Sequence, residues 1–212
     1  EGASLELSVR AFSQPEASGH ALCCTHRLSS LDSKGTGSRA GQMAVLAKDP
    51  VQGDVGKTDL ILEPLFLGGL LHSTTLMLSA FFVEVGMSMY AKKIGRKVAS
   101  DEVTLVDDPT MPSMSQRAFD HEGTPTRRTV AIKDGVLKSY QHNTATAKRF
   151  KTKTTGNAGP YIPLNFNPPA VPLPIHPVVE SGDWTVEEMI ADTKSGLYLN
   201  NTWYTRYQSY SR

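Results

Sequence analysis

Residues 60–83 read LILEPLFLGGLLHSTTLMLSAFFV and form the one long apolar run of the chain. Between Glu63 and Glu84, His72 is the single side chain that can carry a charge. A helix that is apolar on all sides is normally buried. The run therefore predicts a buried strand that leads into a buried central helix at 64–80.

A run of about 20 uncharged residues is also long enough to span a bilayer. However, hydroxyl side chains and His72 make it less apolar than a typical span, and Pro64 and Gly68-Gly69 interrupt its start. Loops elsewhere show no asymmetry of Lys and Arg. We therefore expect a core helix and no membrane partner. In that helix His72 is a hydrogen-bonded core residue, a metal ligand or a catalytic base.

The composition is that of an ordinary globular protein. The chain has 212 residues, 39% of them hydrophobic, and a net charge of +1. The near-neutral charge favours neither nucleic acid nor an anionic membrane as a partner. Lys and Arg cluster at 92–97 and 148–153, but acidic residues offset them elsewhere. Cys23 and Cys24 are adjacent, and neighbours in a strand point to opposite faces, which favours reduced thiols in the cytoplasm.

The segments before the apolar run have the pattern of a small α/β unit. Residues 4–13 alternate apolar and polar side chains, which predicts a half-buried strand, and residues 20–28 are its expected antiparallel partner. A short amphipathic helix is expected at 40–48. We predict an α+β fold: a layered α/β portion at 1–56, then the central helix and a β-rich portion at 57–212.

The second half contains clear turn and cap signals. Asp134-Gly135 lies between two β-rich runs and predicts a type I′ hairpin, because both turn residues need positive φ. The stretch 154–177 is too rich in proline for a helix or a central strand. Thr185-Val186-Glu187-Glu188 is a capping box that starts the last helix. A Tyr-rich, strand-like run ends the chain, which lacks an initiator Met, so we expect a fragment of a longer protein.

Acidic residues at 107–108 and 120–122 are candidates for chemistry. Adjacent carboxylates do not face one site, so Asp107 and Asp108 are interpreted as solvated turn or cap residues. In the second group, Asp120 and Glu122 are suited to accept hydrogen bonds from turn amides, with Gly123 at positive φ.

Several segments resemble, in order, the TldD/PmbA family, also called the TldD/TldE peptidases and modulators of DNA gyrase. The matching segments are DLILEP at 59–64, VTLVDD at 103–108, DHEGTPT at 120–126 ahead of the DGVLKSY hairpin, TGNA at 155–158 and EEMIADTKSGLY at 187–198. The resemblance implies an α+β fold in which this chain is the middle of the protein.

Zinc-binding members of this family carry His-Glu-x-x-x-His on the core helix, with a further cysteine ligand nearer the C-terminus. Two imidazoles and a thiolate hold Zn²⁺, and the glutamate acts as general base. In this chain His72 takes the first ligand position, Ser73 the glutamate position and Met77 the second ligand position. Serine is no base at neutral pH, a thioether is a poor zinc ligand, and no cysteine follows Cys24. The resemblance thus implies a zinc-less PmbA/TldE-type chain without metal ligands, whose TldD-like partner subunit holds the zinc.

By this resemblance the chain is the non-catalytic subunit of a cytoplasmic peptidase complex in peptide degradation. It would shape the substrate chamber, pair with a TldD-like subunit or with itself, and bind a peptide by strand addition. The residues expected to contact the peptide are Glu122, Gly123, Thr124, Gly156 and Asn157.

Two alternatives remain open at this point. One is a hydrolase that uses His72 and Ser73 with the loop at 120–122, although the chain has no G-x-S-x-G motif. The other is a scaffold or peptide-binding module built on the proline-rich and Tyr-rich segments. Direct modulation of DNA gyrase is disfavoured, because no nucleic-acid-binding motif is present. The peptide, the dimer type and the role of His72 are not determined by the sequence.

Overall fold

The computed structural model describes residues 3–53, 55–160 and 170–201. These residues form two compact units, one from the residues up to 68 and from 184 onward, the other from residues 69–183. Both units contain helices and strands, which confirms the α+β class. The domain boundary expected at 56/57 stays a prediction.

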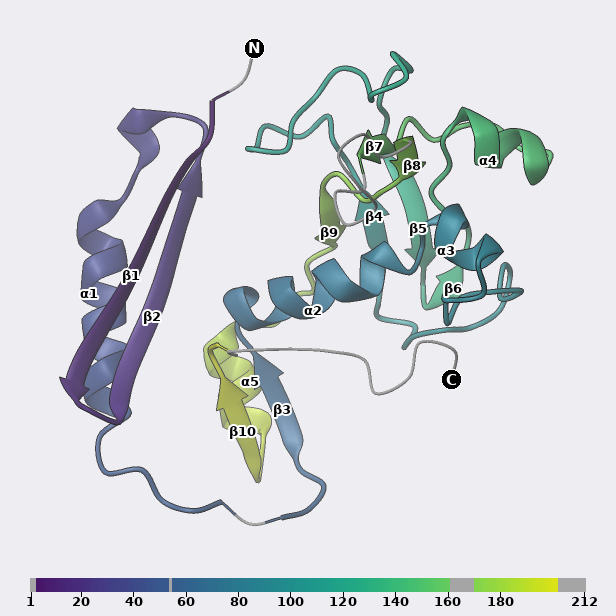
Figure 1. Ribbon diagram of the computed structural model, residues 1–212. Coiled ribbons are helices and arrows are strands. Elements are labelled where there is room, and N and C mark those ends of the chain that lie inside the picture. Colours follow the sequence, from purple (N-terminus) through teal and green to yellow (C-terminus); the bar gives the residue numbers. More distant parts are fainter. Residues whose placement is uncertain (1–2, 54, 161–169, 202–212) are drawn as a thin grey trace. The chain divides into compact units, whose positions relative to one another are not determined.

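The first unit contains two strand pairs with helices beside them (Figure 1). Its elements are β1 (Leu5–Gln14), β2 (Ala17–Thr25), the 3₁₀ helix η1 (Leu28–Ser30), α1 (Ser33–Leu46), β3 (Asp59–Leu62), the start of α2 (Pro64–Leu76), α5 (Val186–Asp192) and β10 (Gly196–Leu199).

The hairpin of β1 and β2 confirms the predicted antiparallel pair, with α1 packed against it. Small residues make this contact close. A Cβ at Gly19 would lie 2.2 Å from the carbonyl oxygen of Ala40, so the helix backbone touches the strand there. Ala40 and Ala44 are fully buried in the same contact.

α1 begins earlier than the start expected at residue 40. The Asp32 side chain accepts a hydrogen bond from the Gly35 N–H at 2.8 Å and caps the helix, which therefore starts at Ser33. The polar, glycine-rich composition of this segment did not indicate a helix, because glycine has a weak intrinsic helix propensity.

The other strand pair, β3 and β10, is parallel, with Leu60 opposite Leu197. The capping box before α5 is confirmed: Thr185 and Glu188 each bond the other's backbone N–H. The Tyr-rich run beyond residue 201 and residues 161–169 of the proline-rich stretch lie outside the described residues.

The second unit is built on a four-stranded antiparallel sheet of order β6-β5-β4-β9 (Figure 1). Besides the end of α2, its elements are α3 (Ala80–Glu84), β4 (Leu105–Asp107), β5 (Thr129–Lys133), β6 (Val136–Leu137), α4 (Thr144–Arg149), β7 (Ala158–Pro160), β8 (Ala170–Pro172) and β9 (Pro177–Val179). The predicted hairpin joins β5 to β6, with φ of 50° at Asp134 and 73° at Gly135.

The core of this unit is one apolar cluster between the sheet and the segment around α3. Its buried members are Met77, Leu78, Ala80, Phe82, Tyr90, Leu105, Ala131, Ile132, Leu137 and Tyr140. The C-terminal third of the long apolar run therefore supplies the core, while most of α2 does not.

The expected buried helix at 64–80 is thus wrong in length and in burial. α2 ends at Leu76, and Thr75 is its one fully buried residue in the described chain. The helix stops because the chain then bonds to another segment: the Ala80 N–H donates to the Gln141 carbonyl at 3.0 Å. Within the described residues, no helix has the length and apolar character needed to cross a membrane.

Candidate functional site

The three positions of the zinc signature lie in different surroundings. His72 is exposed and Ser73 is half-buried. Met77 is only 3% exposed and belongs to the apolar core. In the described part of the chain, no three His, Cys, Asp or Glu side chains are grouped as metal ligands. A thioether in an apolar core and a neutral serine do not fit a zinc ion.

The expectation that His72 is a hydrogen-bonded core residue is wrong. Its ring is exposed and makes no hydrogen bond among the described residues. Ser73 does not bond to it, and the carboxylates of Asp120 and Glu122 are bonded to backbone N–H groups instead. The described residues therefore contain no nucleophile–base pair that includes His72.

Asp120 organises the loop that the sequence singled out. Its side chain is 3% exposed. One carboxylate oxygen, Oδ1, accepts the N–H groups of Glu122 and Thr124, both at 2.9 Å. The other, Oδ2, accepts the N–H of Ala158 at 2.9 Å. The positive φ of 75° at Gly123 closes the turn, as predicted.

The predicted residues Gly156 and Asn157 are brought to this loop from more than thirty positions along the chain. The His121 N–H donates to the Ala158 carbonyl at 3.1 Å, next to the bond from Ala158 to Asp120. Gly156 has a φ of 74°, and a Cβ there would lie 2.7 Å from the Pro125 carbonyl oxygen. Only glycine allows this approach of the two segments.

Asn157 leads from the loop to a second buried carboxylate. Its side chain is 2% exposed, and its amide nitrogen donates to Asp107 Oδ2 at 2.5 Å and to the Leu173 carbonyl at 2.9 Å. Asp107 Oδ1 accepts the N–H groups of His176 at 2.6 Å and Ile175 at 3.1 Å. The pair of Asp107 and Asn157 thus anchors the chain directly before β9.

The interpretation of Asp107 and Asp108 as solvated residues is wrong. Asp107 is 2% exposed and Asp108 is 7% exposed. Burial raises the pKa of Asp107, and the hydrogen bonds from His176, Asn157 and Ile175 oppose this shift. The missed signal was their position in the sequence: Asp107 is the last residue of β4, directly after the buried Leu105 and Val106, and Asp108 follows it.

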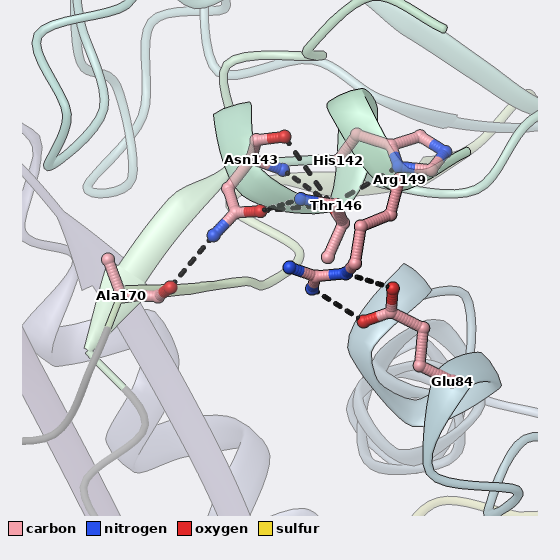
Figure 2. A network of polar contacts seen from close by, with 6 residues as sticks. All are labelled: Glu84, His142, Asn143, Thr146, Arg149 and Ala170. Atoms are coloured by element: carbon pink, nitrogen blue, oxygen red, sulfur yellow. Dashed lines mark hydrogen bonds and ion pairs between the residues drawn. The ribbon is translucent and has the colours of Figure 1, made fainter. Parts of the chain in front are cut away.

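Glu122 connects the loop to α4. Its Oε2 accepts the N–H of Thr144, the first residue of that helix, at 2.8 Å. Asn143 caps the same helix, since its Oδ1 accepts the Thr146 N–H at 2.9 Å. The Asn143 amide nitrogen also donates to the carbonyl of Ala170 in β8 at 2.8 Å (Figure 2). The helix start is therefore held on two sides.

The other end of α4 is held by an ion pair. Arg149 donates to both carboxylate oxygens of Glu84 in α3, at 2.5 and 2.7 Å (Figure 2). His142 directly precedes the Asn143 cap; it is 4% exposed, and its Nδ1 lies 3.2 Å from Thr146 Oγ1. Burial lowers the pKa of His142, and the nearby negative charge of Glu84 opposes this only in part.

Comparison with known proteins assigns the chain a family. The family model described as PmbA/TldA metallopeptidase C-terminal domain matches residues 55–211. A metalloprotease of Methanocaldococcus jannaschii is 34% identical over 149 residues, which cover 69% of this chain and 32% of the relative. A TldD homologue of Haemophilus influenzae is 28% identical, over 75% of this chain and 33% of the relative.

Solved structures share the fold. TldE of Thermococcus kodakarensis superimposes with a TM-score of 0.79 at 28% identity, over 95% of this chain and 45% of that protein. A Thermotoga maritima protein described as a putative modulator of DNA gyrase superimposes with a TM-score of 0.81 at 25% identity, over 93% of this chain and 44% of that protein. The chain thus spans less than half of each of these structures and about a third of the two curated relatives.

We predict that Asp120→Asn destabilises the loop. An amide places an NH₂ against one of the three N–H groups that the carboxylate accepts, which should lower the free energy of unfolding by about 1–3 kcal/mol. Amide hydrogen exchange should accelerate at Glu122, Thr124 and Ala158. Asp183→Asn, at an exposed position of the same unit, is the control and should change neither quantity. Unchanged exchange in Asp120→Asn would contradict the role given to this carboxylate.

The buried His142 should make stability depend on pH. Its folded-state pKa is below the ordinary 6.5, so the unfolded chain binds the proton more tightly. This contribution is present above pH 6.5 and is lost as the pH falls through the lowered folded-state pKa. Urea unfolding of the wild type should show this loss, and His142→Gln should show a smaller one. His72→Gln, at an exposed site, should keep the wild-type dependence; equal slopes in all three would refute the prediction.

Proposed function

This chain belongs to the PmbA/TldD metallopeptidase family, and we propose that it is part of a zinc-less, PmbA/TldE-type subunit of a cytoplasmic complex in peptide degradation. The observation that carries the proposal is the state of the zinc signature. Ser73 replaces the general base, and Met77, in the place of a ligand, is buried in the apolar core. The zinc ion would belong to a TldD-like partner, and this subunit would help to shape the peptide-binding chamber.

An edge strand supports the proposed peptide binding. In the order β6-β5-β4-β9, the outer side of β6 is covered, because the Leu137 N–H donates to the Arg96 carbonyl at 3.0 Å. β9 has no neighbour on its outer side among the described residues. A peptide that adds to this edge would extend the sheet through main-chain hydrogen bonds.

The register of β9 identifies the groups that a peptide would meet. The ladder to β4 uses the His176 carbonyl and the Glu180 N–H, and Val178 lies opposite Val106. Because antiparallel residues alternate between bonding inward and outward, the N–H and C=O of Val179 face the open edge. The Asp107–Asn157 pair would hold this edge in place for the peptide.

The five residues expected to contact peptide divide by burial. Glu122 and Gly123 are exposed and Thr124 is half-buried, so this part of the loop is available to a ligand. Gly156 and Asn157 are buried, and both Asn157 amide bonds are internal. In the proposal the first three contact the peptide, and Gly156 and Asn157 position the loop and β9.

The scaffold alternative keeps one supporting observation, which is the exposed apolar side chains of α5 and of Trp184, two residues before it. Trp184 is 60% exposed and Ile190 is 49% exposed. A scaffold that binds no peptide would use such side chains as an interface.

Metal analysis tests the zinc-less assignment. The full-length protein purified alone should hold well below about 0.1 zinc per chain, and its complex with a TldD-like subunit about one per partner chain, because the ligands must all be present for tight binding. Zinc near one per chain in the isolated protein would overturn the assignment. Zinc missing from both preparations would favour the scaffold.

Peptide binding at β9 is tested by Val179→Pro. Proline removes the outward N–H but no ladder bond. Because the Val179 side chain also packs against the core, circular dichroism must first verify that the variant is folded. The affinity for a labelled peptide of alternating valine and threonine should fall about tenfold, which is the effect expected when one strong backbone hydrogen bond is lost. The same peptide with N-methyl groups on alternate amides should bind the wild type as weakly as the unmodified peptide binds Val179→Pro. Val51→Pro, in an exposed loop, is the control and should bind the peptide as the wild type does. Equal affinities in the wild type and both variants would exclude β9 as the peptide-binding edge.

A further inference from the structure

Two short segments of the second unit carry a high density of positive charge. Each contains four cations within six residues, and every one of these side chains is exposed. The eight residues, called the basic surface below, are Lys92, Lys93, Arg96, Lys97, Lys148, Arg149, Lys151 and Lys153. The whole chain has a net charge of only +1, so this density is local.

The fold brings the two segments to the same side chain. The Tyr140 hydroxyl donates to the Tyr90 carbonyl at 2.7 Å, just before the first segment. The Tyr140 ring also packs edge-to-face on Phe150, with centroids 6.1 Å apart, inside the second segment. Tyr140 therefore contacts the chain at both segments, although they are more than fifty positions apart in the sequence.

Few acidic groups neutralise this surface. Lys97 pairs with Asp101 at 2.8 Å, and Arg149 pairs with Glu84. The other six cations make no ion pair with any described residue: Lys92, Lys93, Arg96, Lys148, Lys151 and Lys153. Cations in the last turn of a helix stabilise it, which accounts for Lys148. The remaining five have no such structural role.

The backbone presents these cations in a fixed arrangement. The Gly95 N–H donates to the Leu137 carbonyl at 2.8 Å, and Lys97 bridges to Val136, so the first segment runs along β6. In the second segment the Thr152 N–H donates to the Ala147 carbonyl at 2.9 Å. A ligand that binds here would not have to order either segment, which lowers the entropic cost of binding.

We propose that the basic surface is a docking surface for an acidic polypeptide segment. Five of its six unpaired cations are lysines, whose ammonium groups are flexible point charges that can pair with carboxylates in several orientations. Ile94, 48% exposed among them, offers an apolar contact to a side chain. The Phe150 ring packs edge-to-face with the rings of both His142 and Tyr140.

Binding of a labelled decaglutamate peptide to the 212-residue chain tests the proposal. The variant Lys92→Ala/Lys93→Ala/Lys148→Ala/Lys151→Ala should bind about tenfold or more weakly, since each exposed ion pair contributes little alone but four are removed. The matched control, Lys34→Ala/Lys48→Ala/Lys57→Ala/Lys194→Ala, removes the same charge from exposed positions of the first unit and should bind within about twofold of the wild type. Far-ultraviolet circular dichroism verifies that both variants are folded.

Two further probes separate the outcomes. Decaglutamine should not bind, and raising NaCl from about 50 to about 300 mM should weaken decaglutamate binding, because salt screens exposed charges. An equal loss of decaglutamate affinity in both lysine variants would show that the peptide responds to net charge alone, and it would overturn the proposal. Tighter binding of a single-stranded oligothymidine than of decaglutamate would also overturn it, in favour of a nucleic-acid surface. Absence of decaglutamate binding at low salt would exclude the proposal that the basic surface binds an acidic polypeptide.

Discussion

The second unit depends on backbone N–H groups that converge on two buried carboxylates. Asp107 accepts N–H groups from Ile175 and His176, and Asp120 accepts one from Ala158 and two from its own loop. A buried carboxylate is costly unless such bonds surround it, and the raised pKa of Asp107 shows that the cost is not fully offset. In return, the two carboxylates fix the loop at 120–124 and the residues at 175–176, which have no regular secondary structure of their own.

This arrangement relates the family motifs to one another. The motif at 103–108 ends in Asp107, the motif at 120–126 begins with Asp120, and Asn157 and Ala158 of the motif at 155–158 bond to both. The three motifs are therefore one structural assembly that positions β9 and the exposed Glu122 loop. The edge strand β9 is thus held in place from one side, and among the described residues its outer side has no neighbouring strand.

The long apolar run shows how composition alone misleads. Its hydrophobicity predicted a buried helix, yet the core takes up residues 77–82, and His72 lies on an exposed surface of α2. Burial is decided by which segments reach the sheet, and the Ala80–Gln141 bond that redirects the chain joins residues that are 61 positions apart. No local pattern in the run carries that information.

Features that depend on neighbouring residues could be predicted from the sequence alone. The alternation of β1, the Asp134-Gly135 turn and the Thr185–Glu188 capping box all follow from residue type and spacing within a few positions. Only the tertiary structure decided the burial of Asp107, the exposure of His72 and the meeting of Asp120 with Ala158. Those features arise from hydrogen bonds and packing between segments 38 or more residues apart, and such contacts depend on the whole fold.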